Sequence, residues 1–173
     1  TPLTTIFFGG GTPSLLEPVQ LARILHQAEI CLGWQADAEI TIEVNPGTAE
    51  QRRFNDFRAI GFNRLSIGVQ SFRDEALQKL GRVHRAEDGE RAYEIARRAG
   101  FDNVSFDLIF SIPGVPEECW SFTVERAVEL GPEHISTYAL TIEEGTDFYR
   151  RLDAGSLQPV DEDVDAQTYE WTV

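Results

Sequence analysis

The stretch AIGFNRLSIGVQSF, residues 59–72, holds the unit on which the fold depends. Gly61 closes a helical pattern, because helices commonly end on a glycine in the left-handed conformation. The run Arg64–Val69 follows it and is short and apolar enough for a buried strand. Gln70 and Ser71 then place hydrogen-bonding side chains where that strand ends. The unit is therefore a helix exit, a strand and a polar strand end.

This unit recurs along the whole chain. Strand-like runs occur at Thr4–Phe8, Ile40–Val44, Arg64–Val69, Val104–Phe110 and His134–Leu140. Helical patterns lie between them, and their exits are marked by Gly33, Gly61, Gly100 and Gly131. Alternating strands and helices predict parallel strands joined by right-handed crossovers. These strands are too few for a closed eight-stranded barrel, so the α/β pattern predicts a partial barrel or an open doubly wound sheet.

The composition bounds the function more loosely. The chain has 173 residues, enough for one sizeable domain, and no secretory signal or bilayer-length apolar run. Its net charge of -14 argues against sequence-independent binding to nucleic acid or anionic membranes. Cys31 and Cys119 lie far apart without CxxC spacing, which favours a reducing compartment and offers no metal site. We therefore expect a cytoplasmic protein without an integral membrane segment.

The ends of the chain indicate a segment of a longer protein. It begins with Thr1, contains no methionine and ends within a helical pattern. We expect residues 1–160 to form the barrel core, truncated at its N-terminus, and residues 161–173 to begin a truncated C-terminal helical extension. A missing first strand would leave one sheet edge unpaired.

Polar residues follow every strand at the same end. They are GGGTPS at residues 9–14, Glu43 and Asn45, Gln70 and Ser71, Asp107, and Tyr138 with Glu143. Parallel α/β folds bind ligands at the carboxyl edge of their strands. The recurrence predicts a binding site on that edge.

The glycine run and the first carboxylate each allow two interpretations. Gly9, Gly10 and Gly11 either form a tight turn or expose backbone groups to the end group of an amino acid. The run is neither a phosphate loop nor GxGxxG, because no Gly-Lys-Ser/Thr follows and Ser14 replaces the last glycine. Glu43 lies in an apolar strand and must be paired, either with Arg64 in a salt bridge or with a ligand.

The other candidate residues also allow both a structural and a functional interpretation. Gln70 is either a satisfied core amide or a ligand donor and acceptor. Asp107 stands among apolar residues, where a lone carboxylate is unfavourable, so we favour a ligand role. Arg82 could fork onto a carboxylate or remain a solvated surface residue. His84 could act as a base, although a single loop histidine is more often structural.

Six stretches taken in order resemble radical SAM proteins related to oxygen-independent coproporphyrinogen III oxidase. They are GGGTPSLL (9–16), EITIEVNPGT (39–48), GFNRLSIGVQSF (61–72), LGRVHRAED (80–88), FDLIFSIPGVP (106–116) and HISTYALTIEEGT (134–146). Within them, GVQSF, LGRVH and HISTYALTIEEGT look more like the haem-chaperone branch. The resemblance implies strands two to six of an incomplete TIM-like (β/α) barrel that binds S-adenosylmethionine and a [4Fe-4S] cluster.

The resemblance also assigns roles to residues. Gly10, Gly11 and Thr12 would contact the amino-acid end of S-adenosylmethionine, and Glu43 matches the strand glutamate. Gln70, Arg82 and Asp107 match the residues that complete the pocket. The oxidase relatives cleave S-adenosylmethionine reductively and decarboxylate a porphyrinogen propionate, whereas the chaperone relatives bind haem and pass it on. The implied partners are porphyrin or haem and an electron donor.

One departure limits these implications. The family's CxxxCxxC loop, which supplies three cluster ligands, is absent, and Cys31 and Cys119 do not match it. We expect those cysteines upstream of Thr1, and no catalysis by this segment alone. A non-catalytic haem carrier remains an alternative, as does a barrel enzyme for a phosphorylated metabolite. The latter needs a late glycine-rich phosphate loop, which SIPGVP (111–116) matches poorly.

Overall fold

The computed structural model describes residues 2–172 and contains one parallel sheet of five strands. The strands are β1 (Leu3–Phe8), β2 (Trp34–Val44), β3 (Arg64–Gln70), β4 (Asn103–Phe110) and β5 (His134–Ala139). Each strand pairs with the next one along the chain, in the order β1-β2-β3-β4-β5. A doubly wound sheet reverses its strand order at a switch point, and this sheet does not. The partial-barrel prediction is confirmed.

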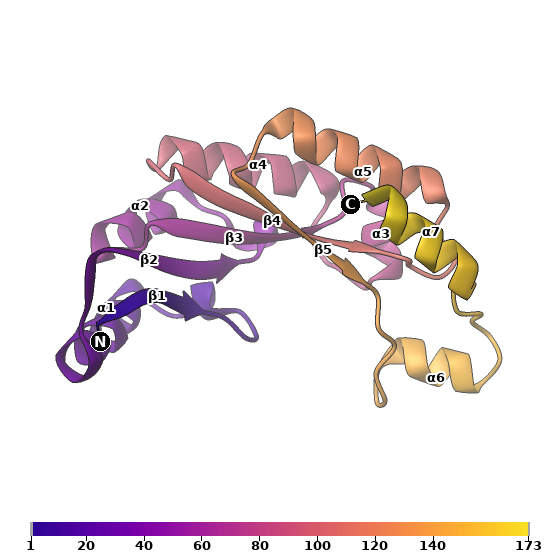
Figure 1. The fold of residues 1–173 in the computed structure, drawn as a ribbon, viewed down its shortest axis with the longest axis horizontal. Helices are drawn as coiled ribbons and strands as arrows, with labels where there is room; N and C mark the ends of the chain where they lie inside the picture. Colours follow the sequence, from indigo (N-terminus) through magenta and orange to yellow (C-terminus); the bar gives the residue numbers. More distant parts are fainter. Residues whose placement is uncertain (1, 173) are drawn as a thin grey trace.

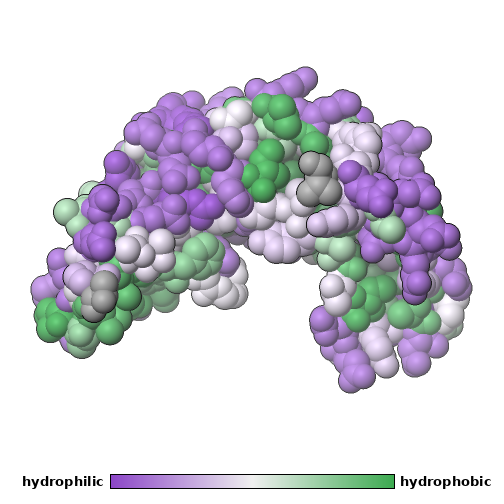
Figure 2. Space-filling view, viewed as in Figure 1, coloured by the Kyte–Doolittle hydropathy of each residue, from purple (hydrophilic) through white to green (hydrophobic). Residues whose placement is uncertain are grey.

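The helices cover the outer face of the curled sheet. The longer crossover helices are α1 (Pro18–Leu32), α2 (Gln51–Ile60), α4 (Ala86–Arg98) and α5 (Glu117–Leu130). The shorter elements are η1 (Pro13–Leu15), η2 (Pro46–Thr48), α3 (Asp74–Lys79), α6 (Asp147–Asp153) and α7 (Glu162–Thr172). The sheet and its helices form an arch whose concave side is open (Figures 1 and 2), and α6 lies apart from the other helices, beyond the end of β5.

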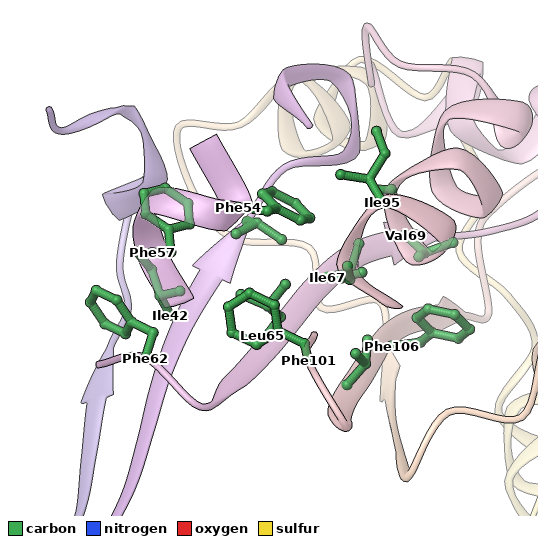
Figure 3. Close-up of a cluster of buried hydrophobic side chains, with 14 of the residues drawn as sticks. Ile42, Phe54, Phe57, Phe62, Leu65, Ile67, Val69, Ile95, Phe101 and Phe106 are labelled. Atoms are coloured by element: carbon green, nitrogen blue, oxygen red, sulfur yellow. The ribbon is translucent and has the colours of Figure 1, made fainter. Parts of the chain in front are cut away.

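The hydrophobic core lies between the sheet and these helices. Leu65, Ile67 and Phe106 are fully buried on the strand side, where they meet aromatic side chains such as Phe54 and Phe101 (Figure 3). Burying each such side chain contributes about 1.5–3 kcal/mol. Because strand side chains alternate, this packing turns the other half of each strand toward the concave side. The polar residues of the strands can therefore form a site on the concave side of the sheet.

Strand β2 is longer than the sequence indicates. It begins at Trp34 rather than Ile40, and Leu3 of β1 pairs with Trp34. The added part contains the exposed polar residues Gln35 and Asp37, so a search for apolar runs does not detect it. No helix among residues 2–172 is long and apolar enough to cross a membrane.

Candidate functional site

A cavity of about 210 Å³ lies at the carboxyl edge of the strands. It is lined by Gly11, Thr12, Glu43, Val44, Asn45, Ser66, Gly68, Gln70, Arg82 and Asp107. Every predicted site residue except Gly10 is among them, and Gly10 binds one of the lining carboxylates. A larger hollow of about 560 Å³ lies between α5 and α7, and none of the predicted site residues lines it. The structure thus brings the predicted residues together.

The glycine run closes one side of the cavity. The Gly10 N–H donates to Glu43 Oε2 at 3.0 Å, and both Gly10 and Gly11 have positive φ, at 84° and 56°. Gly9 is needed for a different reason, since a Cβ there would lie 2.6 Å from Phe7 Cε1 and 2.9 Å from Glu43 Oε1. The run is therefore a turn, and it also brings the backbone close to the Glu43 carboxylate.

Glu43 does not form the salt bridge to Arg64 that the sequence allowed. In the register of β2 and β3, Arg64 is paired with Thr41, which lies two residues before Glu43 on the same face of β2. Arg64 Nε instead lies 3.9 Å from Glu39 Oε2, and its Nη1 donates to Thr41 Oγ1 at 3.4 Å. The hydrogen bond to Gly10 uses one oxygen of Glu43 and leaves the carboxylate facing the cavity.

Asp107 reaches the cavity from β4 and is held by a neighbouring hydroxyl. Ser66 Oγ donates to Asp107 Oδ2 at 2.7 Å. Burial raises the pKa of the Asp107 carboxyl, and it outweighs the hydroxyls of Ser66 and Ser136 and the charges of Arg64 and His134, which lower it. Within residues 2–172 no cation approaches Asp107 within ion-pair distance. Such a carboxylate is suited to accept a hydrogen bond from a ligand ammonium or hydroxyl.

Gln70 ends β3 in an unusual backbone conformation. Its φ is +65°, in the left-handed region that non-glycine residues rarely adopt. A Cβ on Gly68 would lie 2.9 Å from Gln70 Nε2, so the Gln70 carboxamide folds back over Gly68 beside the cavity. Gly68 therefore matters for its lack of a side chain and not for its backbone angles.

Arg82 enters the cavity from the loop between α3 and α4. Its own N–H donates to Leu77 C=O at 2.9 Å, which fixes the start of that loop to α3. The guanidinium is exposed and forms no ion pair with any residue in the described part of the chain. It is thus available for a bidentate contact with a ligand carboxylate.

Sequence reasoning assigned no role to three lining residues, Val44, Ser66 and Gly68, and it named Asn45 only as a polar residue at a strand end. Strand alternation was a usable signal for two of them, because Ser66 and Gly68 have the same parity on β3 as Gln70. Asn45 contributes differently, since its Oδ1 accepts from the Gly47 N–H at 3.0 Å and begins η2. His84, a candidate base from the sequence, is buried, and burial lowers its pKa.

The cavity fits one end of a ligand and not a metal cluster. Its volume lies below the range that holds a whole drug-sized molecule. One cation and two carboxylates around glycine backbone match a zwitterionic amino-acid group. For a cluster, residues 2–172 contain no group of three or more His, Cys, Asp or Glu side chains placed to hold a metal. Cys31 is exposed on α1 and Cys119 is buried on α5, so these residues do not fit an iron–sulfur cluster.

Comparisons with known proteins show the family to which the chain belongs. The family model described as "Radical SAM superfamily" matches residues 2–127. The chain is 44% identical over 162 residues to "Heme chaperone HemW" of Escherichia coli, covering 94% of this chain and 41% of that protein. It is 37% identical over 169 residues to the protein of the same name from Bacillus subtilis, covering 97% of this chain and 45% of that one.

A solved structure extends the likeness to the fold. Coproporphyrinogen III oxidase (HemN) from Escherichia coli superposes with a TM-score of 0.79 at 31% identity, over 96% of this chain and 39% of that chain. The chain thus spans less than half the length of each of these relatives.

Proposed function

Because this chain belongs to the radical SAM superfamily, we propose that its cavity binds the methionine end of S-adenosylmethionine. The observation that carries the proposal is the convergence of Arg82, Glu43 and Asp107 on one small polar cavity. These side chains come from three separate elements, and no salt bridge joins them in the described structure. Positive and negative side chains that are not paired with one another complement a ligand that carries both a positive and a negative charge.

Each residue has a distinct task in this proposal. Arg82 binds the ligand carboxylate through its planar fork. Glu43 accepts from the ligand ammonium while Gly10 keeps its Oε2 in place. Asp107 accepts from a hydroxyl or ammonium, and the Gln70 carboxamide can both donate and accept. Gly11 and Thr12 line the cavity beside these groups.

The chain's own residues bind and orient; they do not supply electrons. When S-adenosylmethionine is bound beside a reduced [4Fe-4S] cluster, the pair supplies radical chemistry. We propose that the intact protein carries three cluster cysteines before Thr1, as CxxxCxxC, and receives electrons from a separate donor. Reading the upstream sequence tests this directly, and a sequence without that triplet would remove the radical chemistry from the proposal.

For the intact protein we propose haem carriage. The supporting observation is the 44% identity to a protein named heme chaperone, against 31% to coproporphyrinogen III oxidase. The oxidase activity is the second candidate, since that enzyme shares the fold with a TM-score of 0.79. The cytoplasm is the compartment we propose, because reducing conditions keep Cys31 and Cys119 as free thiols.

Two measurements on the intact, cluster-reconstituted protein separate these functions. Calorimetric titration with S-adenosylmethionine tests the cavity, and wild-type protein that does not bind it would contradict the proposed site. Haem titration followed by its absorption band, together with coproporphyrinogen turnover, tests the role of the whole protein. Haem binding without turnover supports the carrier, and turnover of coproporphyrinogen supports the oxidase.

A further inference from the structure

The end of β3 contains a strained turn at the edge of the cavity. The Ser71 N–H donates to Val69 C=O at 2.8 Å, closing a three-residue turn around Gln70, whose φ is +65°. A γ-turn with positive φ at its central residue is rare and strained. The register with β4 slips at the same point, because Ile67 faces Phe106 while Gln70 faces Leu108. This bulge re-aims Gln70, and it requires neighbours that hold it in place.

One side of the turn is held by His84. Its Nε2 lies 3.2 Å from Val69 C=O, the carbonyl that also closes the turn. A carbonyl only accepts, so Nε2 carries the proton. His84 is 5% exposed, and its Cβ lies 3.3 Å from the point where a Cβ on Gly47 would stand. The ring is thus enclosed between β3 and η2.

The other side of the turn is held by α5. Thr123 Oγ1 donates to Cys119 C=O at 2.7 Å, so its single proton is used. The Ser71 hydroxyl, 2.9 Å away, must then donate to Thr123, which also accepts from the Phe72 N–H at 3.2 Å. Ser71 is 2% and Thr123 0% exposed. Every proton in this small network has a partner.

His84 also belongs to the loop that carries Arg82. That loop is tied at its start by the Arg82 N–H to Leu77 C=O, and at its end by the Ala86 N–H to Asp74 Oδ1 at 2.8 Å. Between these ties, the ring of His84 joins the loop to Val69, next to Gln70. The His84 side chain therefore links Gln70 at the end of β3 to Arg82 in the loop between α3 and α4, and both of these residues line the cavity.

We propose that His84 is a positioning residue: its Nε2–H, acting with the Ser71–Thr123 pair, holds the Gln70 turn and the Arg82 loop in the geometry that binds ligand. The inference rests on the proposed binding of S-adenosylmethionine at this cavity. His84 acts through Gln70 and Arg82, and its Nδ1 is buried without a partner among the described residues. A proton on Nδ1 would have no acceptor, so the proposed positioning role requires the neutral imidazole ring of His84.

The test compares two His84 variants in the intact, cluster-reconstituted protein by calorimetry with S-adenosylmethionine. His84→Gln keeps a donor at the end of the side chain, and we expect affinity near that of wild type. His84→Leu keeps bulk without a donor, and we expect about a tenfold loss, the size of one net hydrogen bond. His26→Gln is the matched control, because His26 is exposed on α1. Thr123→Ser and Thr123→Val repeat the comparison from the other side of the turn.

The pH profile separates positioning from a general loss of stability. The charges that act on His84 are Arg82 on its own loop and Asp88 on α4; β3 contributes the Val69 carbonyl, and η2 contributes Gly47. Because burial lowers the pKa of His84 below its ordinary value of 6.5, wild-type affinity should fall by an added step at pH values below 6.5, and His84→Gln should lack that step. Identical profiles, or His84→Leu and Thr123→Val binding like wild type, would overturn the inference alone. Absence of binding by wild type would overturn it together with the proposed function.

Discussion

Ser66 on β3 lies diagonally across from Asp107 on β4, two residues beyond its register partner Ser105, and Ser66 Oγ donates to Asp107 Oδ2 at 2.7 Å. The hydroxyl is one of few groups that compensate a carboxylate whose pKa burial raises. A raised pKa means that the folded state holds a proton at a pH where the unfolded state has lost it. Stability from this group is therefore highest below the ordinary pKa of 3.8 and falls as the pH rises through the folded value.

Replacing Asp107 by Asn should stabilise the fold at neutral pH and weaken the site. The neutral amide removes the buried charge, and its oxygen can still accept from Ser66. We expect the melting temperature at pH 7 to rise by a few degrees, and its decline between about pH 4 and pH 7 to become shallower. Thermal melts across that range check this. A lower melting temperature at pH 7 would show that the charge is compensated better than we infer.

Replacing Glu43 by Gln should weaken the binding of S-adenosylmethionine by about tenfold, because a charge-assisted hydrogen bond is lost. The amide oxygen can still accept from the Gly10 N–H, so the melting temperature should change little. Glu39→Gln is the matched control, since Glu39 lies on the same strand, pairs with Arg64 and does not line the cavity. Calorimetry on both variants decides the matter, and equal affinities would remove Glu43 from the site.

Adding one methyl group at Gly68 should displace the Gln70 carboxamide. The new Cβ would lie 2.9 Å from Gln70 Nε2, while the Gly68 backbone itself needs no left-handed angle. We expect Gly68→Ala to reduce ligand affinity by about three- to tenfold. In a Gln70→Ala background the same change should have almost no further effect, because contacting residues are not additive. Full additivity in this double-mutant cycle would contradict the close approach.

Replacing Arg82 by Lys should lower affinity by about tenfold although the charge is kept. A lysine cannot make the planar, two-pronged contact with a carboxylate that arginine makes. Arg91→Lys on α4 is the control, since Arg91 pairs with Asp88 and does not line the cavity. Calorimetry of both variants at two salt concentrations is the measurement. Equal affinities of Arg82→Lys and wild type at both salt concentrations would show that the positive charge is sufficient and would contradict a bidentate contact.

The sequence predicted most of the polar residues that line the cavity, and it did so for a physical reason. Glu43 and Asp107 are carboxylates inside apolar strands, and a polar residue in such a run needs an explanation that a loop residue does not. The repeated order of strand and helix then put them on one edge. The motif around Arg82 gave its position only through the family resemblance, because nothing about an exposed loop arginine distinguishes it.

What the sequence could not provide was register and close approach. Arg64 pairs with Glu39 and not Glu43 because of how β2 and β3 are aligned, and many alignments suit the same apolar pattern. Gly68 has ordinary backbone angles, so only the position of the Gln70 side chain explains it. The role of His84 depends on a turn whose strain appears in backbone angles alone.

The sequential order of the strands has a consequence for how the protein is made. The cavity takes the glycine run after β1, Glu43 from β2, Gln70 from β3 and Asp107 from β4, so each successive unit adds one wall. A nascent chain therefore has no complete site until residue 107 has left the ribosome and β4 has paired. Domains generally fold as units during synthesis. Binding of the ligand to chains stalled during synthesis would therefore report when β4 has paired. This measurement needs no label on the protein.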